Sequence, residues 1–354
     1  MRARLAVVGA AAAALVGLLS LYESRVLGLF PFGEVPPAFT PYHLARSGLA
    51  LLLSALAVSI IWRGRAAGCG LVRERLPASG GAAAAAILAA ALAATLLFLA
   101  DPAQFGRLSA EDRPVEWASA FALLAGSGLF GWNFAVRLRS GVGRAEAALE
   151  LLFAALLFVI AMEEVSWLQR LLDFRTPAEI AALNMQREFN FHNVHTDLSE
   201  NAYYVGAAGF LILLPLIVDA LTLPPAWRGL ADFVPGRWVA AASAPLSIFN
   251  YGMWNVIPQQ VAMMLTVLVM AAYAKAAAAR GDRGESLLFA AMAAAITLGQ
   301  AAFLARGAAM TQIWDASEYK ELFIALGLLC FAIDATVRRR DQPLAAASYS
   351  SSDF

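Results

Sequence analysis

The sequence has little charge, few histidines and few cysteines. Asp, Glu, Lys and Arg make up 15% of its 354 residues, whereas soluble domains carry about 25%. The formal net charge is zero, so the basic surface typical of a nucleic-acid-binding protein is missing and no nucleic-acid partner is expected. The two cysteines, Cys69 and Cys330, are far apart and outside any CxxC pattern. They therefore predict neither a zinc ribbon nor a redox pair.

The sequence is instead rich in apolar residues. Hydrophobic residues make up 60% of the chain and the mean hydropathy is +0.66. Because a membrane-spanning helix needs about 20 mostly apolar residues, the composition predicts an all-α, polytopic membrane protein. Ten stretches qualify as transmembrane helices: 4–22, 42–63, 80–100, 115–137, 146–167, 199–221, 238–257, 260–280, 285–305 and 319–337. The seventh is the weakest, since it holds asparagines and is followed by Pro258.

Positive charge is distributed unevenly between the connections. With a cytoplasmic N-terminus, most basic residues fall on the cytoplasmic side, as the positive-inside rule requires. These are Arg2, Arg4, Arg63, Arg65, Arg73, Arg75, Arg137, Arg139, Arg144, Arg228, Arg237, Lys275, Arg280, Arg283 and Arg338–Arg340. We therefore expect ten spans, both termini in the cytoplasm, a single membrane domain over 1–340 and a disordered cytoplasmic tail over 341–354.

Unusual polar residues gather on the outer side, around the end of the fifth stretch. Glu163 and Glu164 close that stretch, and a continuing helix would place Glu163, Trp167 and Arg170 on one face. Such carboxylates can serve as a general acid/base pair or as metal ligands, or they can form a structural ion-pair network. Further outer-side polar residues precede or begin other stretches: Glu111, Asp112, Arg113, Glu116, Asp197, Glu200, Glu318 and Glu321.

Two patterns follow in the connection to the sixth stretch. Thr176 and Pro177 are typical of a helix start and predict a short interfacial helix through Asn184. In "QREFNFHNVHTD", a helix would align Glu188, His192 and His195 as ligands for a divalent metal such as zinc. An extended segment would instead place Glu188 and His192 on one side without His195. Both conformations agree with the sequence.

These motifs resemble the signature of an uncharacterised group of bacterial multi-span membrane proteins. The "EEVSWLQR", "TP" and "NMQREFNFHN" motifs match the group's EE-[IV]-SW-x-QR, TP and N-x-Q-x-E-x-N-x-HN pattern, and an "ED…VEW" stretch matches earlier. Leu168 stands where the pattern has glycine, and His195 lies outside it. The resemblance implies bacterial origin, hence the inner membrane, and a shared outer-face site, but no reaction.

Three functions are open on the sequence alone. The first is an enzyme acting on a lipid, a lipid-linked or a membrane-embedded substrate, with Glu163, Glu164, His192 and Arg170 as catalytic residues. Arg113 or Arg170 would then hold an anionic headgroup. The others are a non-catalytic subunit or assembly factor with a membrane protein partner, and a transporter or flippase. The expected substrate-binding residues are Glu111, Asp112, Arg113, Glu116, Trp167, Gln169, Gln186, Glu188, Asn190 and Asn193.

Overall fold

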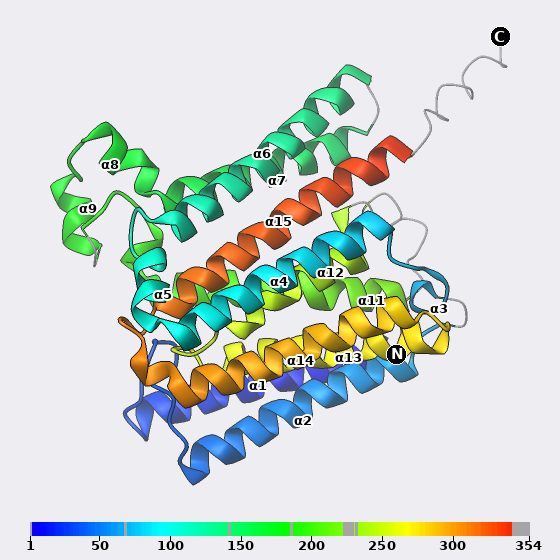
Figure 1. Ribbon diagram of the computed structural model, residues 1–354, viewed down its shortest axis with the longest axis horizontal. Coiled ribbons are helices and arrows are strands. Elements are labelled where there is room, and N and C mark those ends of the chain that lie inside the picture. The colour runs from blue at the N-terminus through cyan, green and yellow to red at the C-terminus, as the bar shows by residue number, and fades with distance from the viewer. Residues whose placement is uncertain are drawn as a thin grey trace.

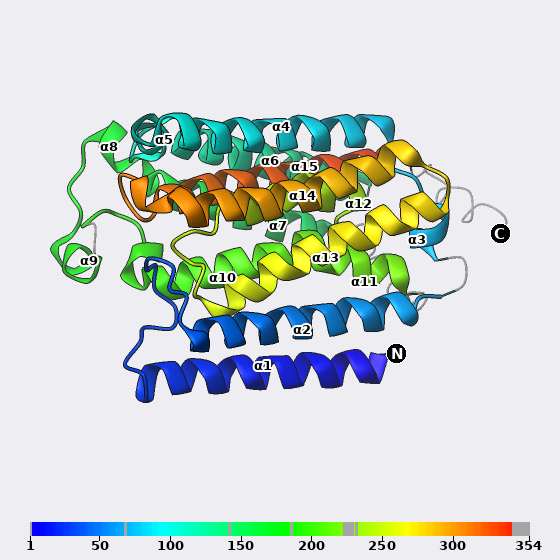
Figure 2. The same cartoon turned by 60° about the horizontal axis from the view of Figure 1, so that its bottom comes forward.

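The protein is an all-helical bundle, as the composition predicts. The computed structural model describes residues 2–66, 69–140, 143–184, 187–221, 230 and 233–341, and every regular element among them is a helix. The long helices run side by side along one axis. The connection between α7 and α10, called the arm below, carries α8 and α9 and projects at one end (Figures 1 and 2). The expected disordered tail lies almost wholly outside the described residues.

Eight of the described helical segments are long and apolar enough to cross a membrane. They correspond to eight of the ten predicted stretches. In chain order they are α1 Arg2–Arg25, α2 Pro41–Arg63, α4 Ala78–Ala100, α6 Pro114–Ser140, α7 Arg144–Glu164, α10 Thr196–Ala208 continued through η3 Gly209–Leu213 and α11 Leu214–Ala220, α13 Ile257–Ala279, and α14 Arg283–Arg306.

The tenth predicted stretch lies inside α15, Asp315–Asp341. This helix is long enough to span a membrane, but acidic side chains lie in its first turn and arginines lie near its end, so it is less apolar than the other eight. The remaining short helices are α3 Gly70–Arg73, α5 Pro102–Ser109, η1 Ser166–Leu168, α8 Gln169–Leu172, α9 Ala178–Leu183, η2 His192–Val194 and η6 Gly307–Ala309.

The seventh predicted stretch crosses the bundle, but only its first half is helical. It comprises α12 Arg237–Ser243, η5 Ala244–Ile248 and an irregular segment before α13, and both helices are fully buried. Gly236 at its start donates to Asp334 near the end of α15, at 2.8 Å. Backbone carbonyls freed inside a membrane protein need protein partners, and Gln300 donates to those of Ser247 and Ile248 at 3.1 and 2.7 Å.

This broken segment forms the centre of the bundle. Helix α12 packs against α4 and α15, α6 packs against α7 and α15, and α13 packs against α2 and α14. The start of α1 and the end of α15 lie at one end of the bundle, while the end of α7 and the starts of α10 and α15 lie at the other (Figure 2). The polar residues singled out above are therefore collected at a single end.

Candidate functional site

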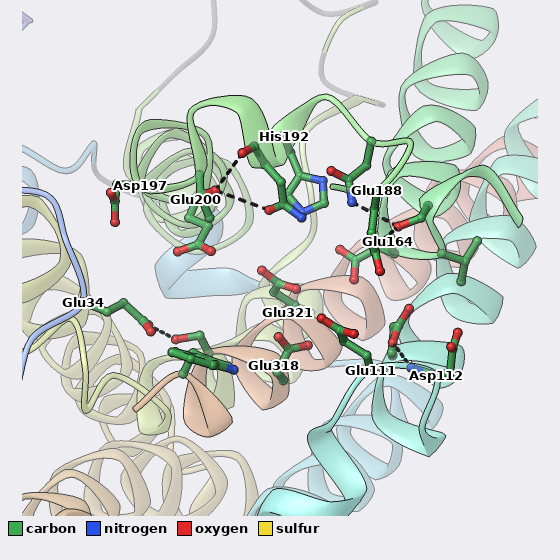
Figure 3. A pocket seen from close by; sticks show the side chains of 18 of the residues that line it. Glu34, Glu111, Asp112, Glu164, Glu188, His192, Asp197, Glu200, Glu318 and Glu321 are labelled. Atoms are coloured by element: carbon green, nitrogen blue, oxygen red, sulfur yellow. Dashed lines mark hydrogen bonds between the residues drawn. The ribbon is translucent and has the colours of Figure 1, made fainter. Parts of the chain in front are cut away.

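A cavity of about 490 Å³ opens at the end of the bundle that carries the arm. Its wall is built by the loop after α1, the start of α6, the end of α7, the arm, and the first turns of α10 and α15. Ten acidic side chains line it: Glu34, Glu111, Asp112, Glu116, Glu164, Glu188, Asp197, Glu200, Glu318 and Glu321. Figure 3 shows these carboxylates converging from separate elements. A volume of this size suits a small molecule or a headgroup.

The chain enters the site through an unusual turn at the end of α7. Ser166, Trp167 and Leu168 have φ values of 44°, 55° and 60°, so three consecutive non-glycine residues are left-handed. This conformation costs roughly 1–2 kcal/mol per residue, and such strain concentrates at functional sites. The turn ends the helix at Glu164, so the predicted shared face of Glu163, Trp167 and Arg170 on a continuing helix is wrong.

Glu163 holds the arm in place and does not line the cavity. Its Oε1 accepts a hydrogen bond from Trp167 Nε1 at 2.6 Å. Its Oε2 accepts from the backbone N–H groups of Phe191 and His192 at 2.6 and 3.0 Å. The His192 ring lies 3.4 Å from the same oxygen. With these four contacts Glu163 fastens the η2 segment to the end of α7. Its role is therefore structural.

Glu164 points the other way, into the cavity. Adjacent residues on a helix lie about 100° apart, so the two glutamates separate at the end of α7. Glu321 of α15 lies on the same cavity wall beside Glu164 (Figure 3). Two neighbouring carboxyl groups away from bulk water disfavour a double negative charge, so the pair is suited to share one proton, the arrangement used in acid–base chemistry.

Arg170 is fully engaged by carboxylates. Its guanidinium contacts Asp112 at 2.6 Å and also pairs with Glu111 and Glu188. Although partial burial acts to lower it, these hydrogen bonds raise the pKa of Arg170 above its ordinary value, so the side chain stays charged. An arginine held by three carboxylates is poorly placed to bind an anionic headgroup, which leaves Arg113 as the other arginine expected to do so.

Side chains of the arm's own motifs stabilise it, beginning with Gln169. Its Nε2 donates to Phe174 O and Thr176 Oγ1 at 3.1 and 2.7 Å, and its Oε1 accepts from Phe189 N at 2.6 Å. Thr176 Oγ1 donates to Arg187 O at 2.9 Å. Thr176 therefore does not cap α9 as predicted, and the expected start at Pro177 moves to Ala178.

Deeper in the arm, two asparagines and a serine form a buried link to the cavity wall. Asn184 Nδ2 donates to Asn190 Oδ1 at 2.6 Å, and Asn190 Nδ2 donates to Ser166 Oγ at 3.0 Å. Ser166 Oγ in turn donates to Glu188 Oε2 at 2.5 Å. The chain runs irregularly from Arg187 to Phe191 before η2. The segment is therefore neither the continuous helix nor the regular extended strand considered from sequence.

Nine of the predicted site residues line the cavity. They are Glu111, Asp112, Glu116, Glu164, Arg170, Glu188, Asn190, His192 and Asn193. Glu163, Trp167 and Gln169 instead support the wall from behind, and Arg113 is exposed beside it. Gln186 lies outside the described residues.

The sequence places Asp197, Glu200, Glu318 and Glu321 among the outer-side polar residues, but it did not assign α10 and α15 to the site. Thr196, Glu200 and Tyr204 recur at four-residue spacing along one face of α10, and Trp314, Ser317, Glu318 and Glu321 recur at three- and four-residue spacing at and after the start of α15. Spacings of three and four residues place these side chains on one helical stripe. The sequence shows both stripes, but it does not show that these two helices face each other.

Glu34 was also missed, because it sits alone in the loop after α1. Ser317 Oγ donates to its carboxylate. Burial raises the pKa of Glu34 to about 7, although the Ser317 hydrogen bond and the charge of Lys320 act in the opposite direction. No motif surrounds Glu34 in the sequence, so only the fold reveals its place.

The expected metal ligands are not brought together. Glu188 pairs with Arg170, His192 lies against Glu163, and His195 occupies the N-cap position of α10, without a capping hydrogen bond from its side chain, and does not line the cavity. Within the described part of the chain, no group of three His, Cys, Asp or Glu side chains is arranged to hold a metal ion.

The polar cavity is confined to the end of the bundle that carries the arm. The residues that line it do not include Asn250 or Asn255 of the broken segment, which a transporter's central site would involve.

Comparison of the chain with protein-family models, with curated proteins and with solved structures gave no match.

Proposed function

We propose that the chain is a bacterial inner-membrane enzyme that performs acid–base chemistry on a lipid, a lipid-linked or a membrane-embedded substrate. The observation that carries the proposal is the pair of carboxyl groups of Glu164 and Glu321 on the cavity wall, of which Glu321 accepts a hydrogen bond from the buried Tyr204 at 2.5 Å. A positioned carboxyl group that gives or takes a proton contributes about 10²–10⁴-fold to a reaction rate. His192 lies on the same wall and can serve as a second proton carrier.

The charge of the cavity indicates what part of a substrate it accepts. Among the described residues, the only basic ones that line it are Arg170 and His192, and both already contact carboxylates. A neutral hydroxyl-bearing or a cationic group would enter more favourably than a phosphate, because like charges repel in a site of low dielectric. We therefore expect the reacting group to be neutral or cationic, with its apolar part in the membrane.

The arm supports a location at the membrane surface. Leu171, Leu172 and Leu183 are exposed on it, as is Phe191 next to the cavity. Apolar side chains beside a spanning bundle suit contact with the acyl boundary of the bilayer. On the ten-span topology, with both termini cytoplasmic, this end faces outward.

The same exposed side chains support an alternative. A non-catalytic complex subunit would use Leu171, Leu172 and Leu183 as a contact surface for a membrane protein partner. The Glu164–Glu321 pair would then have only a structural role.

Turnover in nanodiscs distinguishes the two functions. Purified protein is incubated in nanodiscs made from a bacterial total lipid extract, and lipids and released products are followed by mass spectrometry. We expect conversion by the wild type, a loss of about 100-fold or more in Glu164→Gln, and no loss in Glu179→Gln, a matched change at an exposed position on the arm.

Two outcomes would contradict the enzyme. One is equal conversion by the wild type and Glu164→Gln. The other is no conversion together with a stoichiometric protein partner that is lost on Leu171→Ser and Leu172→Ser, which would establish the subunit.

A further inference from the structure

The two carboxyl groups of the Glu164–Glu321 pair have different surroundings. Tyr204 OH donates a hydrogen bond to Glu321 Oε1 at 2.5 Å, and Tyr204 is fully buried. A hydrogen bond donated to a carboxylate stabilises its charged form. Both groups lie among further carboxylates of the cavity wall, including Glu200 and Glu318, so a second negative charge is disfavoured and the Tyr204 hydrogen bond is what distinguishes Glu321.

A buried lysine strengthens this difference through the tyrosine ring. Lys320 Nζ lies 4.6 Å from the ring centroid of Tyr204, a cation–π distance. A cation over the ring withdraws electron density from the phenol and makes its O–H a stronger donor. In its charged form, Lys320 would therefore act on Glu321 by way of Tyr204.

Lys320 is held in this position from the opposite side. Only 3% of its surface is exposed. Its ammonium donates to Asn250 Oδ1 at 2.7 Å and to Gln259 Oε1 at 2.8 Å. Both acceptors are neutral amides, so the positive charge is not cancelled by a direct ion pair within the described residues. The irregular segment after η5 supplies Asn250, which ties the broken seventh stretch to the site.

We propose that the shared proton is carried by Glu164, and that Tyr204 and Lys320 are positioning residues that keep Glu321 as the carboxylate. In the enzyme proposed above, on which this assignment of roles rests, Glu164 is then the proton donor and Glu321 the proton acceptor. The transfer is balanced, because the proton that Glu164 gives to the substrate is matched by one that Glu321 takes from it.

Other titratable groups face the pair from every surrounding element and must be considered in the test. They are Glu34, Glu116, His192, Glu200 and Glu318. Glutamine replacements at the pair itself leave these groups in place, so differences between spectra isolate Glu164 and Glu321.

Infrared spectroscopy of the protein in nanodiscs measures the proton directly, through the carbonyl stretch of a protonated carboxyl group at neutral pH. We expect Glu164→Gln to lose the absorbance of one carboxyl group and Glu321→Gln to lose none. In Tyr204→Phe and in Lys320→Met, Glu321 should also become protonated, and the absorbance from the pair should roughly double. Tyr22→Phe, the same change at an exposed tyrosine that does not line the cavity, should leave it unchanged.

Loss of the absorbance in Glu321→Gln with retention in Glu164→Gln would overturn the assignment. So would spectra of folded Tyr204→Phe and Lys320→Met that match the wild type, with folding checked by thermal unfolding. The measurement needs no substrate. A failure of turnover would therefore remove the enzyme proposal without changing the position of the proton, and the reverse also holds.

Discussion

At the scale of single residues, the pair Glu163–Glu164 shows how neighbouring identical side chains acquire different tasks. Helix α7 ends at Glu164, directly before the arm. Glu163 therefore accepts hydrogen bonds from the arm, whereas Glu164 lines the cavity. A glutamine at position 163 keeps one acceptor oxygen but turns an NH₂ group toward either Trp167 or the two backbone donors.

We therefore expect Glu163→Gln to weaken the attachment of the arm. The loss of charged acceptors for buried donors should reduce the free energy of unfolding by about 2 kcal/mol. It should also speed hydrogen exchange at the amides of Phe191 and His192, as measured by mass spectrometry. Glu164→Gln is the matched control and should leave this exchange unchanged. Equal protection in the two variants would show that Glu163 does not fasten the arm.

Glu34 gives a prediction about pH. Its pKa is 4.5 in the unfolded chain and about 7 in the fold, because burial raises it. The folded state therefore binds the proton more tightly, and stability decreases with rising pH wherever the folded state carries more protons. The contribution is complete below pH 4.5 and is lost as the pH rises through 7.

Thermal unfolding in detergent at a series of pH values checks this expectation. Glu34→Gln should flatten the decline in melting temperature between pH 4.5 and 7 and should be more stable than the wild type above that range. Glu179→Gln, an exposed control, should follow the wild-type curve. Parallel curves for Glu34→Gln and the wild type would place the titration elsewhere.

At the scale of elements, the turn over Ser166–Leu168 explains where sequence prediction succeeded and failed. Hydropathy placed the fourth and fifth spans well, since 146–167 corresponds to Arg144–Glu164. It ran past Glu164 because left-handed backbone leaves no mark in hydropathy. It also treated 238–257 as a span, although Pro245 and the asparagines that follow interrupt the helix.

The site was predictable only in part for a related reason. Glu164, Glu188 and His192 lie close in sequence and carry an unusual polar pattern for an apolar chain. Glu321 and Tyr204 lie in separate spans, and hydropathy does not reveal which spans pack together. Local spacing therefore predicted the residues of one wall of the cavity, whereas the residues of the other wall depend on tertiary packing.

The turn itself makes a prediction at Leu168. Its φ of 60° suits glycine, which adopts left-handed backbone without steric penalty, and glycine is the residue that the resembling signature has there. Leu168→Gly should be more stable than Leu168→Ala by about 1 kcal/mol, measured by thermal unfolding. At an ordinary helical position the order is reversed. A less stable glycine variant would mean that Leu168 is not left-handed.

At the scale of the whole molecule, the two ends of the bundle differ in charge. The arm end carries the acidic cavity, whereas the opposite end carries buried arginines. There Arg237 pairs with Asp219 at 3.0 Å, and Arg280 pairs with Glu285 at 2.5 Å. These pairs tie the connections before α4, α12 and α14 to one another. The positive-inside rule assigns such an end to the cytoplasm.

This orientation predicts the sidedness of two exposed positions. Asp173 lies on the arm, and Arg75 lies in the connection before α4, where 69% of its side chain is exposed. In intact cells, a membrane-impermeant maleimide should label Asp173→Cys but not Arg75→Cys, both made with Cys69→Ser. After permeabilisation both should be labelled. The buried Cys330 remains in each variant, so the Cys69→Ser protein alone is the control for background.

Labelling of Arg75→Cys in intact cells would show that the topology is inverted and that the cavity faces the cytoplasm. The substrate would then be drawn from the inner leaflet, whereas the proton arrangement of Glu164 and Glu321 would stand, because it depends on contacts within the bundle and not on which side the bundle faces.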